Sequence, residues 1–396
     1  MESMSEKAGK QESYQGDFVL KGQVLSKEFT HVNASWLEKC PTFEGMLQKA
    51  KEEQKRLVDY SGYSLSDVTP ENGTLTFRRG EKVLHANLSL YSAQQLGNRV
   101  DVPGRYLSRL LEVNEKDLFD QNVKAGLART LKEGNDPEMF LRTRVSDTGD
   151  STLRAILSSR YGVINNLPLI ETLSDIIPGG RVSHLFYNGD TLRANILVPD
   201  SIRQESDSDY GGGLSVMNNE TGQLPMSSRP FVFRAICFNG NIWDRADGTE
   251  YSRKHLGDID WTDLRKKLIL NVQTQIPLAL ESIQRVLNLK GIPVSEEDIR
   301  KAIVYIAKRE GITQTAAKDW YASYRIELAS ASTAKEIVSA FGVVQGLTRS
   351  AQNQEIGLQE LMETLSGKLV DSNWDKLFTV SRNEVSQEEI EKVLLA

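Results

Sequence analysis

Met139–Tyr161 is the stretch that decides the fold, and it has the sequence MFLRTRVSDTGDSTLRAILSSRY. Two runs rich in aliphatic and β-branched residues, Phe140–Val145 and Leu153–Tyr161, flank the polar run Ser146–Ser151. Such runs on either side of a polar turn are typical of a β-hairpin. We therefore predict that this hairpin opens a strand-rich central block that extends to Trp243.

The rest of the central block continues with strands around one helix. Leu167–Ile177 is predicted to be helical, because the run is apolar and Pro178-Gly179-Gly180 stops it. Asn188-Gly189 is the strongest short hairpin signal in the chain, and a hairpin is predicted around it. Ser201–Gly213 is predicted to be a polar loop, with its three final glycines as a flexible linker. The predicted strands are Val182–Tyr187, Thr191–Val198, Leu214–Met217 and Pro230–Phe238.

The flanking regions add helices and one further hairpin. Two short helices that begin at Ser92 and Pro103 have the spacing of a helix-turn-helix. No basic recognition face follows them, so packing on a sheet is favoured. The other elements predicted before the central block are a helix at Thr42–Tyr60, a hairpin at Thr74–Leu90 and a helix at Leu118–Lys132. The helices predicted after it are Leu264–Leu289, Ser295–Arg309, Thr313–Tyr324, Thr333–Leu347 and Glu355–Leu365.

This order of elements predicts an α+β fold. Hairpin-linked strands with helices inserted between them favour a largely antiparallel central sheet, and an all-helical C-terminal section follows. The predicted tail at the C-terminus is either mobile or a partner-binding arm. The expected segments are a disordered tail at 1–16, an N-terminal region at 17–133, the central domain at 134–262, a helical domain at 263–368 and the C-terminal tail at 369–396.

Composition narrows the class of protein. The 396 residues carry a net charge of -6, so the chain lacks the overall basic character of many nucleic-acid-binding proteins. Cys40 and Cys237 cannot build a disulfide framework, which favours a reducing compartment. The polar N-terminus is not a signal peptide, and no run reaches the ~20 apolar residues of a membrane helix. We therefore expect a soluble cytoplasmic protein with no membrane partner.

Motifs for catalysis and cofactors are absent from the sequence. The four histidines show no metal-ligand spacing, and there is no phosphate-binding glycine loop, so no catalytic residue, metal or cofactor is predicted. Clustered acids can nevertheless hold magnesium for phosphodiester hydrolysis, and Glu220 with Asp244 or Asp258 would serve a nuclease. Asp258 and Asp260 are better explained as turn and cap residues before a helix. The chain is accordingly predicted not to be an enzyme, with a metal-dependent nuclease as an alternative.

The central hairpin carries a run of arginines. Arg142 and Arg144 lie two residues apart and so on one face of a strand, and Arg154 and Arg160 keep the same parity. With Tyr161 beside them, they would form a platform on which cations meet phosphates and rings stack on the bases of single-stranded DNA. A solvated sheet face with ordinary Arg–Asp pairing explains the pattern equally well. The full set of candidate nucleic-acid-binding residues is Arg78, Arg79, Lys82, Arg142, Arg144, Arg154, Arg160, Tyr161, Arg234, Asn239, Lys254 and His255.

Several short motifs in this block resemble those of the phage/plasmid-like proteins grouped as domain of unknown function 932. They are Arg154–Tyr161 followed by Asn165-Asn166, then Asn218–Gly222, Arg234–Gly240 and Arg253–Gly257, and the resemblance covers roughly Leu88 to Trp261. Asn219 and Thr221 depart mildly from the usual pattern. The resemblance implies a mobile-element origin but no assigned reaction.

The strand-hairpin-helix order is also broadly similar to single-strand annealing proteins of the Rad52-like type, a likeness at the level of fold alone. These resemblances imply a phage-type DNA replication or recombination accessory protein in the host cytoplasm. Its expected partners are single-stranded DNA, further copies of the same chain and other phage replication proteins. A structural component of a phage particle is a further alternative.

Overall fold

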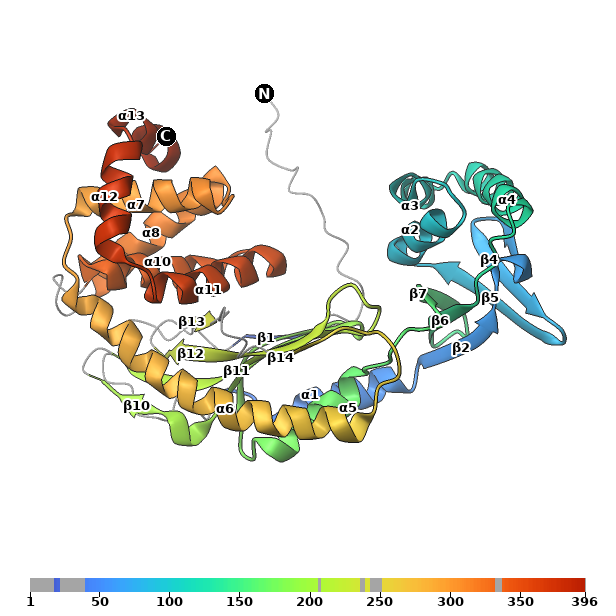
Figure 1. Ribbon diagram of the computed structural model, residues 1–396, viewed down its shortest axis with the longest axis horizontal. Coiled ribbons are helices and arrows are strands. Elements are labelled where there is room, and N and C mark those ends of the chain that lie inside the picture. Colours follow the sequence, from blue (N-terminus) through green and yellow to red (C-terminus); the bar gives the residue numbers. More distant parts are fainter. Residues whose placement is uncertain are drawn as a thin grey trace, which may run out of the picture.

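The computed structural model describes residues 18–21, 40–205, 208–235, 239–242, 251–331 and 337–395. Two mainly antiparallel sheets are followed by a helical C-terminal region, so the predicted α+β class is confirmed (Figure 1). The predicted disordered tail at 1–16 lies outside the described residues. Among those residues, no helix combines the length and hydropathy that a membrane crossing requires.

The smaller sheet has the strand order β2-β6-β7-β5-β4-β3. Its pairs are antiparallel except β5 and β7, which are parallel. The predicted hairpin, β6–β7, therefore completes a sheet begun by earlier strands, and the predicted domain boundary at 133/134 falls inside this unit. The strands are β2 (Leu57–Tyr63), β3 (Val68–Glu71), β4 (Thr74–Arg79), β5 (Lys82–Leu88), β6 (Met139–Val145) and β7 (Ser151–Ser158).

Three helices cover one face of the smaller sheet: α2 (Leu90–Arg99), α3 (Gly104–Glu112) and α4 (Lys116–Lys132). The Ser89 side chain accepts a hydrogen bond from the Ser92 backbone and caps α2. Leu96, Leu107 and Phe119 are fully buried in the core that these helices share with the sheet. The helix pair that begins near Ser92 and Pro103 thus packs on a sheet, as the favoured interpretation predicted.

The larger sheet has the order β1-β8-β9-β11-β12-β13, with β10 beside β11 and β14 beside β12. The hairpin turn predicted at Asn188-Gly189 joins β8 to β9, with Gly189 at a φ of +84°. The strands are β1 (Phe18–Lys21), β8 (Arg181–Tyr187), β9 (Thr191–Leu197), β10 (Arg203–Gln204), β11 (Asp209–Asn219), β12 (Met226–Arg234), β13 (Asn239–Ile242) and β14 (Tyr251–Arg253).

The glycine run Gly211-Gly212-Gly213 is not a flexible linker, so that prediction was wrong. All three residues are buried in β11, between β9 and β12. A Cβ atom on Gly213 would lie 1.9 Å from the Ile196 carbonyl oxygen, which leaves room only for hydrogen. The run therefore allows close approach of neighbouring backbones rather than mobility.

Three helices pack on one face of the larger sheet: α1 (Phe43–Gln54), α5 (Asn166–Ile176) and α6 (Trp261–Asn288). Helix α1 ends before the predicted Tyr60 because Leu57 already begins β2. The Asp260 side chain accepts hydrogen bonds from the backbones of Thr262 and Asp263 at the start of α6. This confirms the interpretation of Asp260 as a cap residue.

The C-terminal helices form one core with the end of α6. They are α7 (Glu296–Arg309), α8 (Gln314–Ser330), α10 (Ala340–Ala351), α11 (Ile356–Val370), α12 (Trp374–Glu384) and α13 (Gln387–Ile390). The prediction of a polar tail after residue 368 was wrong, because Trp374 and Phe378 are buried in this core. Arg382 also binds Asp298 through two hydrogen bonds of 2.6 and 2.8 Å, which hold α12 against α7.

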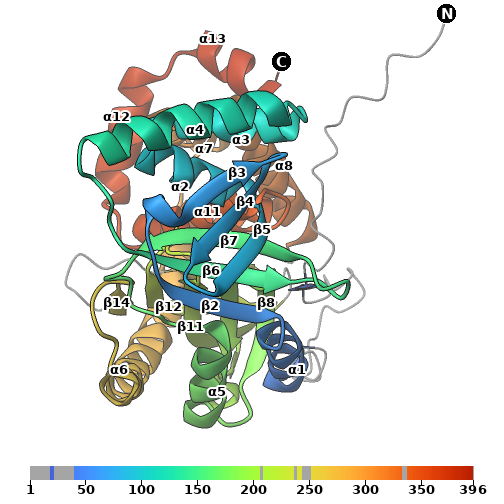
Figure 2. The same ribbon diagram turned by 90° about the vertical axis from the view of Figure 1, so that its right-hand side faces the viewer.

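The units are arranged along the larger sheet. Figure 1 shows the smaller sheet with α2–α4 at one end and the C-terminal helices at the other, both on the same side of the larger sheet. Helix α6 runs along the opposite side. Figure 2, viewed from the end that carries the smaller sheet, shows β6 and β7 crossing above the larger sheet. Most of the motif residues meet at this junction.

Candidate functional site

Arg142 of β6 lies at the centre of the contact between the two sheets. Its guanidinium donates two hydrogen bonds to Asp59 of β2, at 2.9 and 3.0 Å. It also donates to the Glu220 carbonyl oxygen at 2.7 Å and to Asn165 Oδ1 at 2.6 Å. One side chain of the smaller sheet therefore holds both the turn after β11 and the start of α5.

Arg154 of β7 makes the second set of ionic contacts. Its Nε lies 2.5 Å from Asp190 Oδ1, and its Nη2 lies 2.9 Å from Glu220 Oε2. Burial alone lowers the pKa of Arg154, but Asp190 and Glu220 outweigh burial and raise that pKa above its usual value. We call Asp59, Arg142, Arg154, Asp190 and Glu220 the junction cluster.

The junction cluster changes the interpretation of the arginine face. Arg142 is only 1% exposed and Arg154 only 4%, so the prediction of an open basic platform was wrong for these two residues. Arg144 is half-buried and lies 3.4 Å from Glu53 and 3.6 Å from Asp190. The larger sheet covers this face of β6–β7, and the arginines pair with Asp190 and Glu220 of that unit as well as with Asp59 of β2 and Glu53 of α1. The arginines therefore pair with acidic residues, as the alternative interpretation predicted. They do so within a buried cluster and not on a solvated sheet face.

A stack of three rings borders the junction cluster. Phe140 and Tyr161 have ring centroids 6.0 Å apart, and Tyr161 and His255 have centroids 5.2 Å apart with nearly parallel planes. The Tyr161 hydroxyl donates to the Glu220 carbonyl oxygen at 2.8 Å. His255 Nδ1 lies 3.2 Å from the Gly162 carbonyl oxygen and is buried. Tyr161 and His255 thus fasten the segment after β14 to the junction.

The buried His255 imidazole should make the stability of the protein depend on pH. Burial is the main cause that lowers the pKa of His255 to about 4. The hydrogen bond to the Gly162 carbonyl oxygen acts in the opposite direction, and the positive charges of Arg142 and Arg253 lower the pKa further. The unfolded chain binds this proton near pH 6.5, so the stabilisation is complete above that pH and is lost as the pH falls toward 4. The free energy of unfolding should fall between about pH 7 and pH 5 in the parent and in His255→Gln. We expect the fall in the parent to be larger by about 2 kcal/mol. Urea unfolding of both proteins measures it, and equal drops would contradict it.

Three of the four motif segments singled out in the sequence converge on this site, and Arg234–Gly240 does not. Glu220 Oε1 accepts a hydrogen bond from the Asn166 backbone at 2.7 Å. Asn218 Nδ2 donates to the Ile164 carbonyl oxygen at 3.0 Å and to Asn166 Oδ1 at 2.8 Å. These contacts fix the turn after β11 against the N-terminus of α5. Sequence reasoning missed Asp59 and Asp190, which are ordinary strand and turn residues when considered alone.

The remaining candidate residues lie in three other places. Arg234 is buried under the C-terminal helices and donates to Glu327 of α8 at 2.8 Å. The side chain of Asn239 lies outside the described residues. Arg160 and Lys254 are exposed at the rim of the ring stack, where the Gly257 backbone donates to the Arg160 carbonyl oxygen. The structure therefore divides the candidate set and does not bring it together in one groove.

The β4–β5 hairpin carries the other three candidates. Arg78, Arg79 and Lys82 are all exposed at its tip, which projects from the end of the molecule (Figure 1). The side chains of these three residues make no hydrogen bond or ion pair to any residue that the structure describes. Positive charge that the fold does not use is therefore concentrated at this tip.

The acids proposed for a nuclease do not form a metal site in the described part of the chain. Both carboxylate oxygens of Glu220 already accept hydrogen bonds, from Arg154 and from the Asn166 backbone. Asp258 is exposed, and Asp244 lies outside the described residues. No group of histidine, cysteine, aspartate and glutamate side chains within the described ranges is placed to hold a metal ion.

Comparison of the chain with protein-family models, with curated proteins and with solved structures finds no match. The resemblance to the phage/plasmid-like family therefore stays a prediction. The structure contains a buried ionic junction between the two sheets and, away from it, an exposed cationic hairpin.

Proposed function

We propose that the protein binds single-stranded DNA, as an accessory factor of phage-type replication or recombination, and that it acts by binding rather than by catalysis. The observation that supports this proposal is the exposed cationic tip of the β4–β5 hairpin. In an acidic chain whose junction arginines are paired internally, Arg78, Arg79 and Lys82 keep their charge for an external anion. Self-association and contacts with other phage replication proteins belong to the same proposal.

The hairpin offers more than charge. Val83 lies opposite Arg78 across the hairpin and is 42% exposed, so an apolar contact accompanies the cation. Phosphate contacts by Lys and Arg release condensed counterions, which makes such binding steeply salt-dependent. A projecting β-hairpin can lie along single-stranded DNA, because the flexible DNA backbone can follow the protein surface at little cost in free energy.

Removal of the three cations is expected to weaken DNA binding strongly. We expect the triple variant Arg78→Ala, Arg79→Ala and Lys82→Ala to bind oligo(dT) at least about tenfold more weakly at moderate salt. Each lost contact to a single strand lowers the salt slope by about 0.7, so the slope should fall by about 2. Fluorescence anisotropy with a labelled oligonucleotide, titrated at several salt concentrations, measures both quantities.

The matched control removes three cations elsewhere. Arg265→Ala, Lys266→Ala and Lys267→Ala change the net charge by the same amount on the exposed start of α6. This control should bind DNA nearly as the parent does. Equal losses in the two triple variants would mean that net charge alone matters, and absence of binding by the parent at low salt would reject the function.

A further inference from the structure

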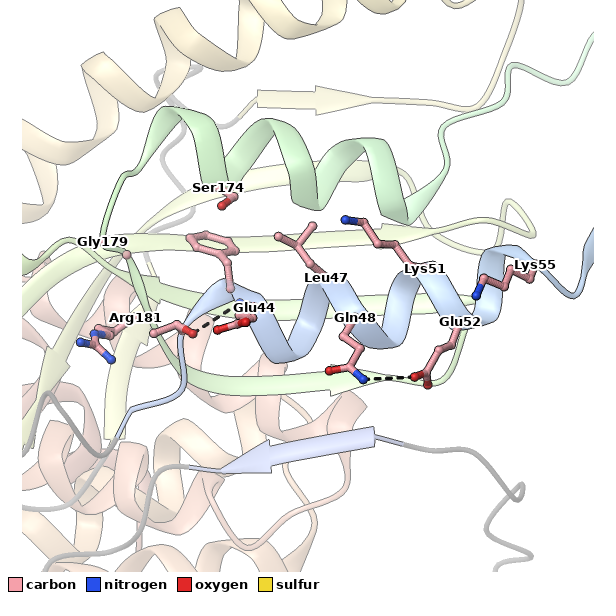
Figure 3. Close-up of a pocket in the computed structure, with 12 residues that line it drawn as sticks. Glu44, Leu47, Gln48, Lys51, Glu52, Lys55, Ser174, Gly179 and Arg181 are labelled. Atoms are coloured by element: carbon pink, nitrogen blue, oxygen red, sulfur yellow. Dashed lines mark hydrogen bonds between the residues drawn. The ribbon is translucent and has the colours of Figure 1, made fainter.

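A groove separates α1 from the C-terminal part of α5 and the turn that follows it. Its volume is about 750 Å³, within the range of ligand-binding sites, and it is open to solvent. Figure 3 shows Leu47 and Lys51 of α1 pointing to the side on which Ser174 of α5 lies. The groove is remote from the β4–β5 hairpin, because α1 and α5 lie on the far face of the larger sheet.

One face of α1 gives the groove a direction. Phe43, Leu47, Lys51 and Lys55 follow one another at intervals of four residues, so they lie in a row along the helix. Phe43 is buried and Leu47 is half-buried, whereas both lysines are exposed. The row itself therefore changes from apolar to cationic along the helix, while Glu44 and Arg181 line the groove at the Phe43 end with one charge of each sign.

The cationic end has no internal counter-ion among the described residues. The ammonium groups of Lys51 and Lys55 make no ion pair or hydrogen bond there, while the neighbouring Lys49 pairs with Glu53. Glu52 receives a hydrogen bond from Gln48 on the side of α1 away from α5 (Figure 3). An anionic group that enters at this end would meet two uncompensated ammonium groups one helical turn apart.

We propose that this groove binds an acidic amphipathic segment of a partner protein. Apolar side chains of that segment pack on Phe43 and Leu47, and its carboxylates bind Lys51 and Lys55. Grooves of this kind accept an amphipathic helix through anchors on successive turns. A nucleic acid fits less well, because its phosphates follow one another at every step and some would lie beside Glu44 and Glu52, whereas an amphipathic helix can carry carboxylates only where they face the lysines.

The test uses two synthetic peptides of about 16 residues, each with leucine on one helical face. One peptide has glutamate on its other face and the second has lysine, and both carry a fluorescent label. We expect the glutamate peptide alone to bind the full-length protein, and Lys51→Glu with Lys55→Glu to weaken it at least about tenfold. The control variant Lys124→Glu with Lys132→Glu, on exposed positions of α4, should bind as the parent does.

Three results of the direct binding measurements would overturn this proposal. They are binding of the lysine peptide with equal affinity, equal loss in the two double variants, and no binding of the glutamate peptide at about 100 μM. Displacement of the bound peptide by oligo(dT) would assign the groove to nucleic acid instead. None of these results depends on the hairpin variant, so this proposal and the proposed DNA binding fail separately.

Discussion

Replacement of Glu220 by alanine is expected to lower the free energy of unfolding by about 3–5 kcal/mol, because it leaves buried charge without its partner. Glu220 is 1% exposed, and its carboxylate lies 2.9 Å from Arg154 Nη2 and 3.8 Å from Arg142 Nη2. Without it, two guanidinium groups share Asp59 and Asp190 alone. The Asn166 backbone also loses its acceptor at the start of α5.

Urea unfolding of Glu220→Ala beside Asp147→Ala measures this effect. Asp147 pairs with Arg56 on the surface at 2.9 Å, and its side chain is 83% exposed, so its loss should cost less than about 1 kcal/mol. The double variant Arg154→Met with Glu220→Leu should be less destabilised than Glu220→Ala, since it removes the unpaired charge as well. Similar losses for Glu220→Ala and Asp147→Ala would show that the junction cluster contributes little to stability.

The candidate site could be predicted only in part, because its charges pair over long distances in sequence. The period of two in the strand correctly indicates that Arg142 and Arg144 share a face. It does not indicate what covers that face. The carboxylates that bind Arg142 and Arg154 are separated from them by 83, 36 and 66 residues, and only the packing of two sheets brings them together.

The fold shows the same division between local and distant causes. The turn at Asn188-Gly189 and the caps at Ser89 and Ser295 act within a few residues, and the sequence predicts the elements that they bound. The place of β6–β7 beside β5 depends on a parallel pairing across three intervening helices. The burial of Trp374 depends likewise on distant helices, so the polar composition of this segment does not indicate that it packs in a core.

Gly213→Ala is expected to lower the free energy of unfolding by about 3 kcal/mol or more, since the new methyl group has no space. Its Cβ would lie 1.9 Å from the Ile196 carbonyl oxygen and 2.9 Å from the carbonyl carbon. Both atoms are backbone, so they cannot yield by a change of rotamer. Strands β9 and β11 would have to separate in the middle of the larger sheet.

The neighbouring glycines are the matched controls, because all three lie in β11 without a positive φ. A Cβ on Gly212 would lie 3.2 Å from Ala279 Cβ, and one on Gly211 would lie 3.4 Å from Leu197 Cδ2. We expect Gly212→Ala to cost about 1–2 kcal/mol and Gly211→Ala less than about 1 kcal/mol. Thermal unfolding of the three variants gives the order directly. A flexible linker would tolerate all three substitutions equally. A loss of stability that increases from Gly211→Ala through Gly212→Ala to Gly213→Ala would instead show that close backbone packing, and not mobility, requires glycine at this point of the sheet.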